Sequence, residues 1–105
     1  MEKRKIAILG STGSIGVQAL DVIREHRDLF DVQLLTAGSN SSLLIRQAIE
    51  FDTACAIIAD ESLYDEVYEA LNPHGINVFA GMGSIIDAMS TSDNIDMVLS
   101  AMVGF

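Results

Sequence analysis

The chain has 105 residues, half of them hydrophobic and a fifth charged, with one proline and one cysteine. A chain of this length holds one domain with a single core, and its composition excludes disordered, collagen-like and disulfide-stabilised classes. Six basic against fifteen acidic residues give a net charge of −9, which disfavours nucleic acid as a partner.

The first predicted element is a strand near residues 5–9, and it runs directly into a glycine-rich turn before a helix that begins at about Ser14. The turn reads Gly10, Ser11, Thr12, Gly13, Ser14, Ile15 and Gly16. Glycines here allow a tight bend, let a pyrophosphate approach the main chain and let the helix pack closely against the strand. The spacing is GxxGxxG instead of the more common GxGxxG, and the alternative interpretation is a tight turn that holds no ligand.

The negative charge of the chain would repel a dinucleotide, so any phosphate site has to rely on local dipoles. The amides at the start of a helix, together with the helix dipole, attract a phosphate without the help of a lysine. The turn before Ser14 therefore predicts a pyrophosphate site that an acidic domain can provide.

Cofactor choice is expected to be set where the second predicted strand, near residues 32–37, ends. NAD enzymes usually place an Asp or Glu there to hold the ribose 2′-hydroxyl. This chain has no acid at that point; the segment reads Gly38, Ser39, Asn40, Ser41 and Ser42. Amides and hydroxyls there can receive a 2′-phosphate, so NADPH is favoured over NADH. The alternative is that Asn40, Ser41 or Ser42 only caps the next helix.

The rest of the chain continues the alternation, with strands predicted near residues 54–58, 77–80 and 96–101. Apolar residues at helical spacing indicate three further helices: Leu44, Ala48 and Phe51; Leu63, Val67, Ala70 and Leu71; Met82, Ile85, Ile86 and Met89. The pattern predicts an α/β fold, a Rossmann-like doubly wound parallel sheet of about five strands with helices on both faces.

No catalytic or metal-binding residue is predicted within these 105 residues. Glu61, Asp65 and Glu69 stand one helical turn apart, but carboxylates on an outer helix face are ordinarily solvated. The methionines at apolar positions are interpreted as core residues: Met82, Met89, Met97 and Met102.

The chain is expected to be a single domain that lies in a reducing, cytoplasmic compartment. The lone Cys55 cannot form an internal disulfide, and no apolar run approaches the roughly 20 residues that cross a bilayer. The last predicted strand runs straight into the apolar segment 102–105, which is an unusual end for a natural domain. We therefore expect residues 1–105 to be truncated before a catalytic domain.

Three segments resemble the N-terminal part of 1-deoxy-D-xylulose 5-phosphate reductoisomerases. The most specific segment is 8–16 followed by 20–23, and the others are 37–40 and 100–104. The resemblance implies that Thr12, Gly13, Ser14 and Ile15 contact the NADPH pyrophosphate. It also implies that Gly38, Ser39 and Asn40 hold the adenosine ribose phosphate and that Ala101, Met102 and Val103 lie near the nicotinamide.

For the whole enzyme, the resemblance implies isomerisation and NADPH-dependent reduction of 1-deoxy-D-xylulose 5-phosphate to 2-C-methyl-D-erythritol 4-phosphate, in non-mevalonate isoprenoid biosynthesis. It implies a magnesium or manganese ion and a phosphosugar substrate, both bound downstream of Phe105, and a homodimer. The 105 residues alone would then be inactive. Many family members carry Lys or Arg at the position of Ser39, so the 2′-phosphate would be held less firmly, or by amides and other hydroxyls.

Two other functions fit a GxTGxxG turn. A semialdehyde dehydrogenase cofactor domain would be distinguished by a catalytic cysteine downstream, and the match through Ile23 argues against it. A nucleotide-sensing module without catalysis would require the natural protein to end near Phe105.

Overall fold

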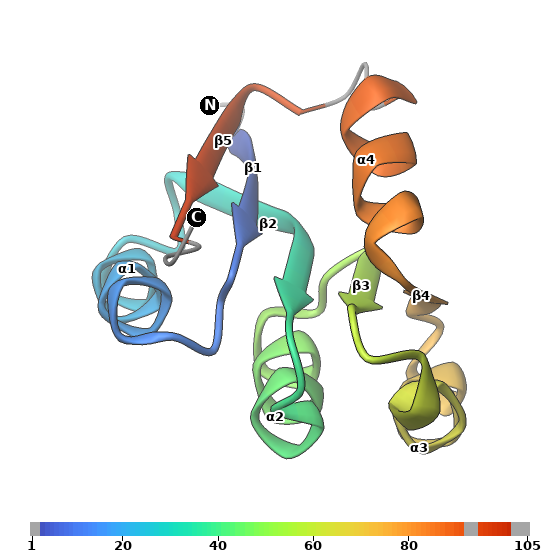
Figure 1. The fold of residues 1–105 in the computed structure, drawn as a ribbon. Helices are drawn as coiled ribbons and strands as arrows, with labels where there is room; N and C mark the ends of the chain where they lie inside the picture. The colour runs from blue at the N-terminus through green and yellow to red at the C-terminus, as the bar shows by residue number, and fades with distance from the viewer. Residues whose placement is uncertain (1–2, 92–94, 102–105) are drawn as a thin grey trace.

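A computed structural model describes residues 3–91 and 95–101. The strands are Arg4–Leu9 (β1), Phe30–Ala37 (β2), Cys55–Ile58 (β3), Asn77–Ala80 (β4) and Met97–Ser100 (β5). The α-helices are Ser14–Glu25 (α1), Ser41–Phe51 (α2), Tyr64–Leu71 (α3) and Met82–Thr91 (α4), and 3₁₀ turns at Glu61–Leu63 (η1) and Asn72–His74 (η2) flank α3. Each predicted strand and helix is present (Figure 1).

All neighbouring strands pair in parallel, in the order β4-β3-β2-β1-β5. The chain therefore builds the sheet outward from β1 to β4 and then crosses back to place β5 on the other side of β1. This reversal makes the carboxyl ends of β1 and β5 the topological switch point, where open α/β sheets bind their ligands. The predicted doubly wound α/β fold is confirmed.

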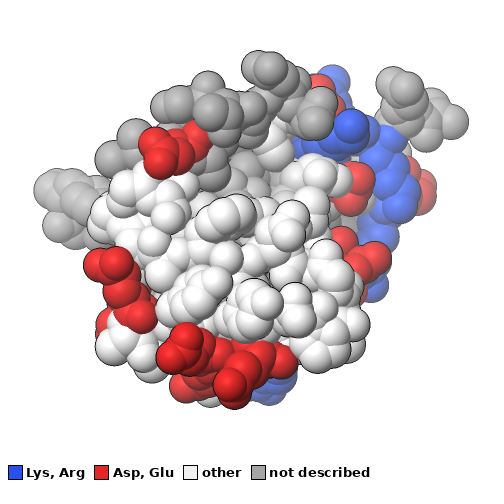
Figure 2. Space-filling model, turned by 90° about the vertical axis from the view of Figure 1, so that its right-hand side faces the viewer, with Lys and Arg blue, Asp and Glu red and all other residues white. Residues whose placement is uncertain are grey.

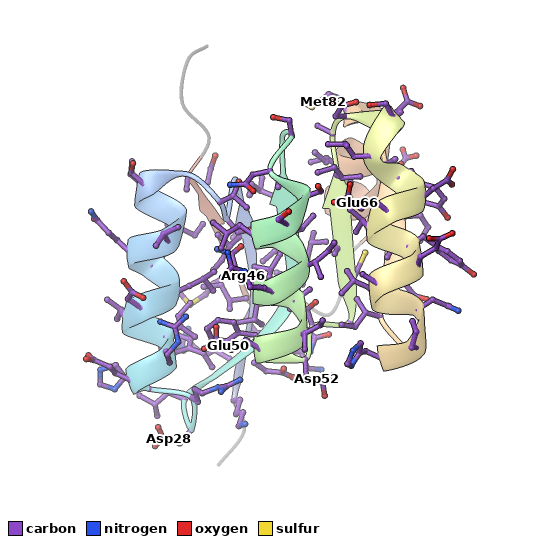
Figure 3. All side chains as sticks on the ribbon, turned by 90° about the horizontal axis from the view of Figure 1, so that it is seen from below. Asp28, Arg46, Glu50, Asp52, Glu66 and Met82 are labelled. Carbon is purple, nitrogen blue, oxygen red and sulfur yellow. The ribbon has the colours of Figure 1, made fainter. Side chains whose placement is uncertain are left out.

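One face of the sheet carries the larger core, and α1, α2 and α3 lie side by side over it (Figures 1 and 3). Each helix contributes an apolar stripe, including Leu20 of α1, Leu44 of α2 and Val67 of α3. The stripes of α2 and α3 are those that the sequence spacing predicted. These side chains pack on buried strand residues such as Ile8 and Leu35. Burial of apolar surface at about 25 cal/mol per Å² is the main force that holds these layers together.

The opposite face of the sheet carries a smaller core and is covered in part by α4. Ile85 packs there on Ala7, Leu34 and Ile57. On the side formed by α3, β4 and α4 the surface is largely free of charged side chains, with carboxylates at its margin (Figure 2). Large apolar side chains on β4, on α4 and on this face of β5 remain 47 to 50% exposed: Phe79, Met82 and Val98.

The interpretation of Met82 and Met97 as core residues was wrong. Their apolar pattern predicts burial, but Met82 lies on α4, the only described helix over the smaller core, and is 48% exposed. Met97 is in register with Ile6 on the other face of the sheet, and it is 40% exposed because β5 is an edge strand. Met102 lies outside the described residues, as does the side chain of Met89.

An ion pair fastens the carboxyl-terminal halves of α1 and α2. The guanidinium of Arg24 donates to both carboxylate oxygens of Glu50, and its Nη1 lies 2.6 Å from Oδ1 of Asp21. Hydrogen bonding to Arg24 lowers the pKa of the Glu50 carboxyl. Both partners of the Arg24–Glu50 pair are more than a third exposed, so it is worth less than about 1 kcal/mol.

Among residues 3–91 and 95–101, the helices are too short and too polar for any of them to span a bilayer.

Candidate dinucleotide-binding site

The glycine-rich turn is held against the end of β2 by its own main chain. Gly10 has a φ of 81°, in the left-handed region that favours glycine. The N–H groups of Gly10 and Ser11 donate to the carbonyl oxygen of Thr36 at 3.1 and 2.8 Å, and Gly10 N–H also reaches Oγ1 of Thr36 at 3.0 Å. Thr36 is buried at the position just before Ala37, so the turn and the loop after β2 share one anchor.

Gly16 provides the close approach between α1 and the turn. A Cβ atom at this position would lie 2.3 Å from the carbonyl oxygen of Gly10 and 2.7 Å from Cα of Ser11. Real Cβ atoms do not approach the main chain so closely, and the main chain cannot rotate away as a flexible side chain can. Gly16 is therefore required by packing, as the spacing of the motif predicts.

Gly13 differs from Gly16, because a side chain would fit at this position. The nearest atoms to a Cβ placed there would be the carbonyl oxygens of Gly10 at 3.7 Å and Ala101 at 4.0 Å. Its φ of −78° and ψ of 173° are open to any residue. The fold does not require glycine at this position, whereas a ligand that approaches the main chain would.

The start of α1 is arranged to receive an anion. Gly13 is the N-cap and supplies no side-chain cap, and the first turn contains no acidic residue. Val17 N–H donates to the Gly13 carbonyl oxygen at 2.9 Å, so the amides of Ser14, Ile15 and Gly16 precede the first intrahelical donor. Ser14 and Ile15 are exposed. Amides and helix dipole together give a positive potential in a domain whose net charge is −9.

Ser11 is fully buried, and its polar groups pair inside the protein. Its hydroxyl donates to Oε1 of Gln47 at 2.7 Å, and its carbonyl oxygen accepts from Nε2 of the same residue at 2.9 Å. Ser11 thus belongs to the framework of the turn. Sequence reasoning missed Gln47, although a signal was present: it is a polar residue at a core position of α2, between the buried Leu44 and Phe51.

The segment after β2 lies exposed at the start of α2. Gly38, Ser39 and Asn40 all face solvent, and Asn40 caps α2 through Oδ1, which accepts from Leu43 N–H at 3.3 Å. Ser41 is buried, and its hydroxyl donates to Glu66 of α3 at 2.5 Å, between α2 and α3 (Figure 3). The capping role of Asn40 is confirmed, and it leaves Ser39 and the amide nitrogen of Asn40 at the surface.

The end of β5 meets the glycine-rich turn from the other side. Ala101 is buried, its N–H donates to the carbonyl oxygen of Leu9 at 2.7 Å, and its own carbonyl oxygen lies near Gly13. Met102 and Val103, predicted beside the nicotinamide, lie outside the described residues. The predicted segments around 10–16, 38–40 and 101 therefore meet at the carboxyl-terminal edge of the sheet.

In the part of the chain that the structure describes, no three His, Cys, Asp or Glu side chains are grouped closely enough to hold a metal ion. Burial raises the pKa of the Cys55 thiol to about 11, which keeps it protonated and unreactive at neutral pH.

Comparison with known proteins places the chain beside one group of enzymes. The curated 1-deoxy-D-xylulose 5-phosphate reductoisomerase of Porphyromonas gingivalis is 52% identical over 103 residues, which is 98% of this chain and 26% of that protein. The Bacteroides thetaiotaomicron enzyme of the same name is 47% identical over 104 residues, again 26% of its length. The chain thus spans about a quarter of the length of these relatives.

Solved structures similar to this chain belong to the same group of enzymes. The reductoisomerase from Zymomonas mobilis in complex with NADPH superposes with a TM-score of 0.91 at 34% identity, over 98% of this chain and 27% of that one. A DOX-P reductoisomerase in complex with NADPH, fosmidomycin and magnesium gives a TM-score of 0.88 at 27% identity, over 96% of this chain and 25% of that one. The family model for 1-deoxy-D-xylulose 5-phosphate reductoisomerase matches residues 6–105. The chain therefore belongs to the 1-deoxy-D-xylulose 5-phosphate reductoisomerase family.

Proposed function

We propose that this chain is the NADPH-binding part of an enzyme that converts 1-deoxy-D-xylulose 5-phosphate to 2-C-methyl-D-erythritol 4-phosphate in non-mevalonate isoprenoid biosynthesis. The observation that carries the proposal is the uncapped start of α1 at the switch point between β1 and β5, in a chain that matches this family from residue 6 to residue 105. The relative from Zymomonas mobilis was solved with NADPH, which supports the choice of cofactor.

The proposed placement of the dinucleotide follows the edge of the sheet. Its pyrophosphate lies over Gly13, where the main chain is open, and accepts from the amides of Thr12, Ser14 and Ile15. The adenosine ribose phosphate lies against Gly38, Ser39 and Asn40. The nicotinamide end points toward Ala101, followed by Met102 and Val103.

Each part of the chain then has a defined task. The bound cofactor supplies a hydride, and the residues of this chain bind and orient it. Amides at the start of α1, together with the helix dipole, stabilise the negative charge of the pyrophosphate, so no cationic side chain is needed there. The absence of an acid after β2 leaves space and hydrogen-bond donors for a 2′-phosphate.

Further proposals concern the whole protein. We propose that the phosphosugar substrate and a magnesium or manganese ion are bound by sequence outside these 105 residues, since the chain spans about a quarter of its relatives' length. The DOX-P reductoisomerase solved with magnesium and fosmidomycin supports the metal. We also propose that the whole protein is a cytoplasmic homodimer and that residues 1–105 alone are inactive.

The proposed activity is tested with the natural protein that carries this chain. NADPH absorbance is followed with 1-deoxy-D-xylulose 5-phosphate and Mg²⁺, and the product is identified by mass spectrometry. We expect NADPH consumption that requires both substrate and metal, with 2-C-methyl-D-erythritol 4-phosphate as the product. The proposal fails if NADPH is not consumed when both are supplied.

Cofactor selectivity gives a second test, at Ser39. Replacing Ser39, which is exposed, with arginine places a cation beside the proposed 2′-phosphate position. A charge-assisted contact should tighten NADPH binding roughly tenfold and leave NADH binding unchanged. Titration of both cofactors by fluorescence measures this. Equal tightening of both would mean that residue 39 does not face the 2′-phosphate.

A further inference from the structure

Gln47 stands out as an amide placed in an apolar stripe. It lies on the buried face of α2 with Leu44, Ala48 and Phe51, and it is 5% exposed. An unpaired amide in such a position costs stability, and a leucine or methionine would fill the space without that cost. The amide oxygen and nitrogen of Gln47 instead both bond to one residue of the glycine-rich turn, 36 positions earlier in the chain.

The two hydrogen bonds fix the orientation of both partners. The carbonyl oxygen of Ser11 can only accept, so it requires Nε2 of Gln47, at 2.9 Å. Oε1 of Gln47 then receives the Ser11 hydroxyl at 2.7 Å. With the Ser11 N–H bound to Thr36 at 2.8 Å, all the polar groups of Ser11 are engaged by α2 and β2.

A consequence for the next residue follows from peptide geometry. The bond between Ser11 and Thr12 is trans, so the Ser11 carbonyl and the Thr12 N–H point in opposite directions. Because Gln47 draws the carbonyl inward toward α2, the Thr12 N–H is turned away from α2.

We propose that Gln47 is a positioning residue for dinucleotide binding. It sets the peptide plane after Ser11 so that the Thr12 amide faces the pyrophosphate. It also ties α2, whose N-terminus follows the segment 38–40, to the glycine-rich turn, which keeps the two halves of the site at a fixed separation. This inference rests on the proposed NADPH function and adds to it a residue that touches no cofactor atom.

The test compares variants of the natural protein by NADPH titration. Gln47→Met keeps the length of the side chain and removes both hydrogen bonds. Gln47→Leu also removes both hydrogen bonds and keeps the position apolar. We expect each variant to weaken NADPH binding about tenfold or more, because the turn is no longer held in its binding geometry.

Two comparisons separate positioning from general stability. Leu44→Ala lies on the same stripe and is expected to lower the melting temperature at least as much, with NADPH affinity within twofold of wild type. Adenosine 2′-phosphate, which reaches only the segment 38–40 in the proposed arrangement, should bind the Gln47 variants as it binds wild type. A double variant that combines a Gln47 substitution with Ser11→Ala should lose less affinity than the sum of the two single losses. Both substitutions remove the same hydrogen bond, from the Ser11 hydroxyl to the Gln47 side chain.

The outcomes distinguish the two proposals. If wild type binds NADPH and both Gln47 variants bind it equally well, the positioning role is overturned while the proposed function stands. The positioning role is also overturned if Leu44→Ala weakens NADPH as much as Gln47→Met does, since the effect would then be one of stability. If wild type itself does not bind NADPH, both proposals fail.

Discussion

Gly16→Ala is expected to destabilise the protein by about 3 kcal/mol and to abolish NADPH binding, although it adds a single methyl group. That methyl would lie 2.3 Å from a main-chain oxygen in the turn, so either α1 or the turn has to move. Displacing α1 opens the core under Leu20 and shifts the amides that face the proposed pyrophosphate. Chemical denaturation and NADPH titration measure the two effects.

Gly83→Ala is the matched control, because it places the same methyl group on a helical glycine of α4 with no atom within 4 Å. Alanine is favoured over glycine in helices by about 0.5–1 kcal/mol, so this variant should be as stable as wild type or slightly more stable. A Gly16→Ala protein as stable as Gly83→Ala would contradict the close packing of α1 on the turn.

Gly13→Val is expected to abolish NADPH binding while the fold survives. The backbone at Gly13 suits any residue, and its nearest neighbours leave ordinary contact distances, so the loss of stability should stay near 1 kcal/mol, the usual cost of a poor N-cap. The valine side chain would occupy the space through which the proposed pyrophosphate reaches the amides of α1.

Thermal melting followed by NADPH titration checks this result. Gly83→Val, the same change at an exposed glycine of α4, should leave the affinity for NADPH unchanged. Wild-type affinity in Gly13→Val would remove the pyrophosphate from this position. Gly16→Ala thus tests a packing requirement, and Gly13→Val tests a ligand requirement.

The fold was predictable because its signals are local and repeated. Short runs rich in Ile, Val and Leu alternate with helical spacing along the whole chain, and parallel pairing follows from that alternation.

What the sequence could not reveal depends on contacts between distant segments. The pairing of Gln47 with Ser11 spans 36 positions, and nothing in either local pattern indicates the other partner. Met82 and Met97 were predicted to be buried but are exposed, for a related reason. An apolar pattern identifies an apolar face of a helix or strand, but it does not indicate which segment, if any, packs on that face. The glycine motif, by contrast, was visible because its roles at Gly10 and Gly16 are set by the chain within a few residues.

Hydrogen–deuterium exchange of the natural protein with and without NADPH tests most directly whether the carboxyl-terminal edge of this sheet holds the cofactor. Slower exchange is predicted for the amides of residues 12–16 and 38–43 when NADPH is present, with little change in the carboxyl-terminal half of α3. Binding of NADPH that protects other segments and leaves residues 12–16 unchanged would contradict the proposed site.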